Sequence, residues 1–170
     1  TTEIYTLSLH DALPIFKKRE EYQIVEIEGE GISWEESIEA RRKALLSDLF
    51  FTGTNAVTED GMLVNLDMIG NRVAGITFGP RQVVIVVGRN KITADLDAAM
   101  ARVKDYASPV NASRFNLKTP CVKTSLCHDC SSADRICNVW TITEKSFPKG
   151  RITVIRSEEH TSELQSRQVI

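Results

Sequence analysis

Four cysteines fall within 17 consecutive positions of the sequence: Cys121, Cys127, Cys130 and Cys137. Two residues separate the middle pair, so a tight turn can aim both sulfurs at one ion, and the outer two can complete a tetrahedral set. Thiolates in this pattern suit zinc or an iron–sulfur cluster. His128 lies inside the middle pair, which makes three cysteines with one histidine a second ligand set. The spacing therefore predicts a metal or iron–sulfur centre and does not distinguish zinc from iron.

Two other interpretations of the cysteines remain open at this stage. They could be redox-active thiols, or structural cysteines that are either buried and inert or joined in disulfides. The first residues show neither the basic segment nor the cleavage site of a secretory signal. We therefore expect a reducing, cytoplasmic compartment, in which disulfides are disfavoured.

Polar turns that follow predicted strands form a second candidate site. In an open α/β sheet, ligands bind beyond the carboxyl ends of the strands, where such turns present backbone N–H groups. Arg72 and Lys91 add cationic donors for a carboxylate or a phosphate. The alternative is that these segments are simply tight turns, which use Gly and Asn for backbone reasons. The candidate ligand-binding residues are Gly53, Thr54, Asn55, Gly70, Asn71, Arg72, Gly88, Asn90 and Lys91.

Two further patterns carry less chemistry. Glu59 and Asp60 could act as a general acid–base pair, but with Gly61 they are first a hairpin turn signal. The apolar run 83–87 ends in Gly88 without the glycine fingerprint of a dinucleotide-binding fold, so such a site has no direct support.

The elements that would position these residues alternate between helices and strands. Ser33 with Glu36 forms a capping box before a helix that we expect to run to about Leu46. The β-branched run 83–87 predicts a parallel strand buried on both faces. A second helix is expected from about Thr93 to Tyr106. Further strands are predicted at 22–27, 48–52, 138–144 and 152–155, with a hairpin at 55–67. This mixture predicts an α/β fold.

Composition excludes two function classes. The 170 residues include 42% hydrophobic and 26% charged residues, with a formal charge of −2. No stretch is apolar over 18 residues, which argues against a membrane-spanning helix. The balanced charge argues against general nucleic-acid binding, which requires a basic surface.

Both ends of the chain look foreign to the rest. Residues 1–15 and 156–166 resemble in-frame translations of the two common short-read sequencing adapters, so we expect 1–15 and 156–170 to be adapter-derived. The remaining segment 16–155 has 140 residues. Removal of two arginines and five acidic residues changes its formal charge to +1, and His128 becomes its sole histidine.

Two long stretches of the remaining segment resemble a known family. The stretch FFTGTNAVTEDGMLVNLDMIGNRVAGITFGPRQVVIVVGRNKI is similar to the LUD domain of lactate utilization protein C. The stretch PVNASRFNLKTPCVKTSLCHDCSSADRIC resembles the cysteine-bearing segment of its short stand-alone bacterial members. The resemblance implies a three-layer α/β sandwich like the ribose-5-phosphate isomerase, glucosamine-phosphate deaminase and CoA-transferase group. It also implies a part in oxidising L-lactate to pyruvate beside iron–sulfur oxidoreductase partner proteins.

The family's motifs fall on both candidate sites. Its turn motifs map to the ligand-binding residues above and to Glu59, Asp60 and Gly61. Its cysteine motif maps to the four cysteines, which favours an iron–sulfur cluster over zinc. Members usually have a further amino-terminal helix, strand and Gly-rich turn, and a short carboxyl-terminal tail. The fold is therefore expected to be incomplete at its amino terminus and destabilised. Alternative functions are a binding or transferase module for an acyl or phosphorylated ligand, and a zinc-stapled regulatory domain.

Overall fold

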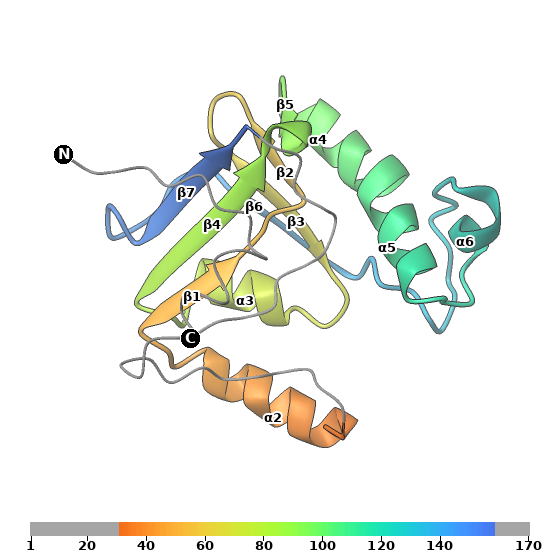
Figure 1. The fold of residues 1–170 in the computed structure, drawn as a ribbon. Coiled ribbons are helices and arrows are strands. Elements are labelled where there is room, and N and C mark those ends of the chain that lie inside the picture. Colours follow the sequence, from red (N-terminus) through yellow and green to blue (C-terminus); the bar gives the residue numbers. More distant parts are fainter. Residues whose placement is uncertain (1–30, 159–170) are drawn as a thin grey trace.

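Two β-sheets and a layer of helices make up the computed structural model, which describes residues 31–158 (Figure 1). One sheet is parallel and has the strand order β1-β4-β7, with β1 at Leu49–Thr52, β4 at Gln82–Gly88 and β7 at Ile152–Ser157. The other sheet is mixed and has the order β5-β2-β3-β6. The predicted α/β class is confirmed.

The mixed sheet contains the predicted hairpin. Strand β2 (Ala56–Thr58) turns into β3 (Leu63–Asp67) through Glu59, Asp60 and Gly61, and Gly61 has a φ of 97°. The Gly61 N–H donates to the Thr58 carbonyl over 2.9 Å, so the two acidic residues form a turn, as we expected. Strand β6 (Val139–Thr143) flanks β3, and the short β5 (Ile92–Thr93) flanks β2.

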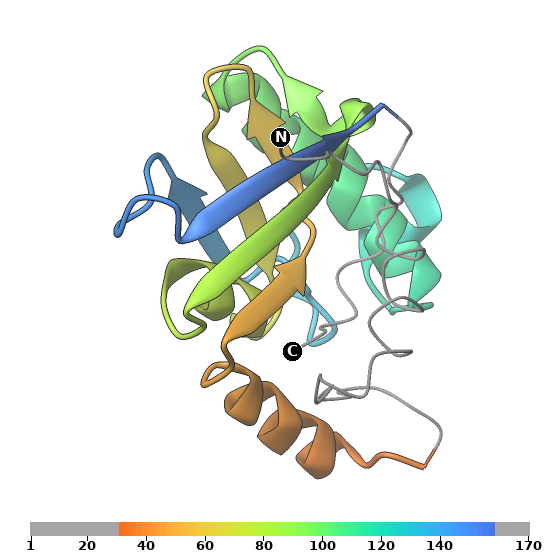
Figure 2. The same ribbon diagram turned by 60° about the vertical axis from the view of Figure 1, so that its left-hand side comes forward.

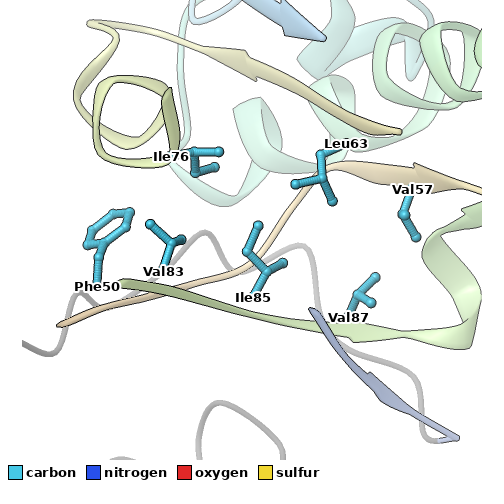
Figure 3. Packing of buried hydrophobic residues seen from close by; sticks show 7 residues of the cluster. All are labelled: Phe50, Val57, Leu63, Ile76, Val83, Ile85 and Val87. Carbon is cyan, nitrogen blue, oxygen red and sulfur yellow. The ribbon is translucent and has the colours of Figure 1, made fainter. Parts of the chain in front are cut away.

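The main core lies between the two sheets. Figure 3 shows seven side chains of this core that meet from both sheets and from helix α3 (Asn71–Thr77): Phe50, Val57, Leu63, Ile76, Val83, Ile85 and Val87. Side chains alternate along a strand, so Phe51 and Val86 point to the opposite face, where they are buried as well. The prediction that the 83–87 strand is buried on both faces therefore holds.

A second apolar cluster joins the mixed sheet to helices. Ala56, Val64 and Leu66 pack there against Ala99 and Val103. The helices are α4 (Leu96–Arg102), a π-helical turn (Val103–Ala107) and α5 (Ser108–Arg114). Parallel sheet, mixed sheet and helices thus form three layers, and Figure 2 shows α4 and α5 beyond the mixed sheet.

Helix α2 (Trp34–Ala44) begins as its sequence predicts. Ser33 accepts a hydrogen bond from the Glu36 N–H over 3.2 Å, and the Ser33 N–H donates to the Glu36 carboxylate over 2.8 Å. The capping box therefore satisfies two donors at the helix end.

Two helical segments differ from expectation. The sequence predicts a turn at Gly70, Asn71 and Arg72, but Gly70 is the N-cap of α3 and the other two residues begin that helix. The helix expected to end at Tyr106 begins at Leu96, continues through the π-helical turn and reaches Arg114. Pro109 has no N–H, and its ring clashes with the carbonyl four residues earlier in a regular helix. The wider π-helical turn just before it relieves that clash and lets the helix continue.

The chain ends fall mostly outside this description. The strand predicted at 22–27 and the adapter-like residues 1–15 lie outside the described residues, as do residues 159–170. Strand β7 continues through Arg156 and Ser157, which pair with Val87 and Gly88 of β4. Backbone pairing accepts almost any side chain, so this pairing does not test the origin of those two residues.

Candidate functional site

All four cysteines line one small cavity of about 20 Å³. Cys121 comes from helix α6 (Pro120–Thr124), and the other three come from the loop that leads to β6. The opposite wall comes from the π-helical turn and α5, through Lys104, Ser108 and Pro109. Each cysteine is a free thiol of intermediate burial. The structure therefore brings the four predicted metal ligands to one cavity.

Two tight bends shape the cysteine loop. Helix α6 ends at Ser125, which has a φ of 58° and donates its N–H to the Cys121 carbonyl over 2.8 Å. Asp129 has a φ of 45°, and its N–H donates to the Cys127 sulfur over 3.5 Å. The Thr119 hydroxyl lies 3.1 Å from the Cys121 sulfur. The loop thus places polar groups beside two of the four sulfurs.

Positive charge gathers around the thiols. The Asp129 carboxylate holds Lys104 at 2.6 Å and Arg135 at 2.8 Å, and both cations line the cavity. Arg135 also donates to the backbone carbonyls of Cys130 and Cys137. Burial raises the pKa of the Cys137 thiol, whereas Lys104 and Arg135 act to lower that pKa. The two cations would therefore offset part of the negative charge of several thiolates.

The donor types around this cavity suit a thiolate-bound metal, but their arrangement differs from that of a filled site. A zinc ion requires sulfurs about 2.3 Å from one point. Among residues 31–158, no three Cys, His, Asp or Glu side chains stand in an arrangement that would hold one ion. His128 lines the same cavity, and its Nε2 lies 2.7 Å from the Thr124 hydroxyl. Binding of one ion by these cysteines would therefore require their sulfurs to move together.

The predicted polar turns meet in the structure. Strands β1 and β4 are parallel neighbours, so the turns after Thr52 and after Gly88 leave the same sheet edge. Lys91 is buried and donates to the Thr54 carbonyl over 3.3 Å. Arg102 donates to the carbonyls of Asn55, over 2.6 Å, and Asn90, over 3.0 Å. Many of the polar groups in these turns are therefore engaged with one another.

Arg72 lies at the centre of a buried polar network. Its side chain is 3% exposed, and it forms an ion pair with Asp67 at 2.6 Å. It also donates to the Asn55 side chain over 2.7 Å, to the Asn65 side chain and to the Gly53 carbonyl. Burial lowers the pKa of Arg72, and the Asp67 charge opposes that effect. Most N–H donors of Arg72, a candidate ligand-binding residue, are thus used in hydrogen bonds within the protein.

A larger cavity of about 360 Å³ lies beside this network, between α2, α3 and α5. Of the nine predicted ligand-binding residues, Asn71 and Arg72 line it. Sequence analysis missed the residues that α2 and α5 contribute, among them Trp34, Asn111 and Arg114. The available signal was helical spacing: Ser108 and Asn111 are polar, three residues apart and buried. Ser108 lines both this cavity and the cysteine cavity.

A family model matches most of this chain. The model is that of the LUD domain, and the match covers residues 6–155 of 170. The chain belongs to the LUD domain family. The resemblance seen in the two sequence stretches is confirmed, and the LUD domain is associated with lactate utilization. No curated protein and no solved structure gives a significant match to the chain. In residues 31–158, no helix of this LUD domain is long and apolar enough to cross a membrane.

Proposed function

We propose that this LUD domain protein is a component of L-lactate oxidation to pyruvate and holds a thiolate-bound metal centre, with an iron–sulfur cluster as the expected form. Cys121, Cys127, Cys130 and Cys137 would supply the ligands. The observation that carries the proposal is the shared cavity: four free thiols from two segments line it together with two cations, Lys104 and Arg135. Iron–sulfur oxidoreductases are the expected partner proteins, and a small carboxylate is the expected substrate.

The proposed centre suits an oxidation. Conversion of L-lactate to pyruvate removes two electrons and two protons, and an iron–sulfur cluster carries electrons one at a time to an acceptor. Lys104 and Arg135 would partly offset the negative charge of the thiolates. Asp129 forms ion pairs with both cations. The Asp129 N–H also donates to the Cys127 sulfur.

The test is metal and sulfide analysis of the chain purified without oxygen. We expect bound iron, acid-labile sulfide and visible absorbance, all lost in Cys127→Ser and Cys130→Ser. Ser131→Ala is the matched control, because Ser131 is an exposed neighbour in the same loop, and it should keep the iron. One equivalent of bound zinc without iron would contradict the iron–sulfur cluster and would support the alternative of a zinc-stapled domain. A metal-free chain with four titratable thiols would end the metal proposal.

The lactate role has a separate test in cells. A strain that lacks the gene should grow poorly on L-lactate and normally on pyruvate, because only the first carbon source needs the oxidation. Normal growth on L-lactate in that strain would contradict the role even if the chain binds metal.

A further inference from the structure

Hydrogen bonds close the cysteine loop, residues 118–138, near its base. Lys118 precedes helix α6, and its N–H donates to the Asp134 carboxylate over 2.9 Å. The Lys118 carbonyl accepts the Ser132 hydroxyl over 3.1 Å, and the Asp134 N–H donates to the same hydroxyl over 3.2 Å. Helix α6 itself lies beside α5, away from both sheets (Figure 1). Three of the four cysteines therefore lie within a segment that polar groups of the protein close.

Arg135 binds three separate points of this loop. Its Nε donates to the Cys137 carbonyl over 2.9 Å, and its Nη1 donates to the Cys130 carbonyl. Its Nη2 donates to the Asp129 carboxylate over 2.8 Å. The guanidinium carries its donors in a rigid planar fork, so one side chain sets the relative positions of these three acceptors. Asp129 also pairs with Lys104 at 2.6 Å, which connects the loop to the π-helical turn.

These ionic contacts are partly shielded from water. The side chains of Arg135 and Lys104 are each 26% exposed, although Asp129 is 71% exposed. Hydrogen bonds from a charged donor are stronger than neutral ones, and partly buried charges are screened less by salt than exposed ones. Loss of the Arg135 contacts should therefore loosen the loop more than loss of an exposed cation nearby.

In a structural zinc site, the bound metal supplies the free energy that folds the surrounding segment. The cysteine loop has polar bonds of its own, near its base and across its middle. We propose that Arg135 is a positioning residue: it holds the cysteine loop in its folded shape without a metal and keeps the thiols at one cavity for metal binding. The inference rests on the proposed function, because it takes the four cysteines as the metal site. It adds that the protein, and not the metal, sets the shape of that site.

The test is hydrogen exchange, followed by mass spectrometry on the full 170-residue chain after reduction and removal of metal with a chelator. Exchange reports how often a segment opens. The loop peptides should exchange more slowly than in the unfolded chain, because N–H groups such as those of Ser125 and Arg135 are bonded within the loop. A peptide that covers β4 reports whether the rest of the fold is intact.

Arg135→Lys is the decisive variant. It keeps the positive charge beside the thiols, but its ammonium is a single point charge that cannot serve three separate acceptors. The loop should then exchange about tenfold faster, as loss of bonds from a charged donor implies, while β4 exchanges as in the parent. Lys118→Gln is the matched control, because Lys118 is an exposed cation that closes the loop through its backbone, which the substitution retains.

Zinc affinity of the same chains, measured by competition with a chelator, connects the loop shape to the metal site. Arg135→Lys should weaken zinc binding about tenfold, because residues that orient metal ligands contribute about 10- to 100-fold to metal affinity. The inference is overturned by a loop without protection in the metal-free parent, or by unchanged exchange or unchanged zinc affinity in Arg135→Lys. A parent that binds no zinc, with faster loop exchange in Arg135→Lys, would support the role of Arg135 in the loop and contradict the metal centre.

Discussion

Removal of the Asp67 charge should destabilise the fold more than any surface change. Asp67 is 3% exposed and serves two partners. One carboxylate oxygen pairs with the Arg72 guanidinium at 2.6 Å, and the other accepts the N–H groups of Arg72 and Val73, each over 3.0 Å. Those two N–H groups belong to the first turn of α3, whose N-cap residue Gly70 has no side chain. Asp67 therefore caps the helix and neutralises its buried arginine at once.

The expected magnitude follows from these contacts. Asp67→Asn keeps the size of the side chain but leaves the Arg72 charge buried without a counter-charge, which costs about 3–5 kcal/mol. Small domains have a total stability of about 5–15 kcal/mol. With a urea slope of about 2 kcal/mol per molar, the midpoint should fall by about 2 M.

A second variant separates the lost charge balance from the lost cap. Arg72→Met leaves both asparagine acceptors with other donors, since Asn55 Oδ1 still accepts the Leu66 N–H over 2.9 Å. Asn65 Oδ1 likewise keeps the Thr54 hydroxyl at 3.0 Å. The double variant Asp67→Asn/Arg72→Met should therefore be more stable than Asp67→Asn alone.

The assay is urea unfolding at pH 7, followed by circular dichroism. Asp48→Asn is the matched control, because its pair with Arg81 is 85–89% exposed and contributes at most about 1 kcal/mol. Two results would contradict this prediction. One is an Asp67→Asn free energy of unfolding within about 1 kcal/mol of the parent value. The other is a double variant that is less stable than Asp67→Asn.

Three smaller predictions concern α3 and α2. Gly75→Ala should destabilise the chain by about 1–3 kcal/mol, because the new Cβ would lie 2.8 Å from the Phe50 ring; Gly53→Ala, with 3.9 Å of room, should be near neutral in the same thermal melt. Ser33→Ala should cost about 1 kcal/mol in urea unfolding. Hydrogen bonds from Ser33 hold the pKa of Glu36 below its ordinary value of 4.5. Ionised Glu36 therefore stabilises the fold at neutral pH, and this stabilisation is lost as the pH falls through the lowered pKa. In Glu36→Gln, the free energy of unfolding should fall less steeply toward acid pH. An unchanged profile would contradict the assignment.

Local signals were sufficient for several elements. Ser33 and Glu36 are three residues apart and cap the same turn, so one short motif predicts the start of α2. The run at 83–87 predicts a buried parallel strand, because β-branched residues without alternation require cover on both faces. The four cysteines lie in a single short segment and line one cavity, whereas a metal held there stays a prediction.

Contacts between segments that are distant in the chain could not be predicted from the sequence. Helix α3 has seven residues and no side-chain cap of its own, and its N–H partner Asp67 comes from a strand. Pro109 is a residue type that normally ends a helix. The π-helical turn before it, which lets the helix continue, was not predicted from the sequence. Lys104 and Ser108 reach the cysteine cavity from another helix, and no spacing rule connects them to Cys127. The large cavity likewise combines Trp34 with Asn111, which are far apart in the chain.

The most direct test of the central claim is X-ray absorption at the iron and zinc edges of the chain purified without oxygen. We expect a bound metal whose nearest shell consists of sulfur at about 2.3 Å, and iron–iron scattering when the centre is a cluster. The shell should disappear in Cys130→Ser and persist in Ser131→Ala. A nearest shell of oxygen and nitrogen only, or no bound metal at either edge, would contradict the claim that the four cysteines hold a metal centre.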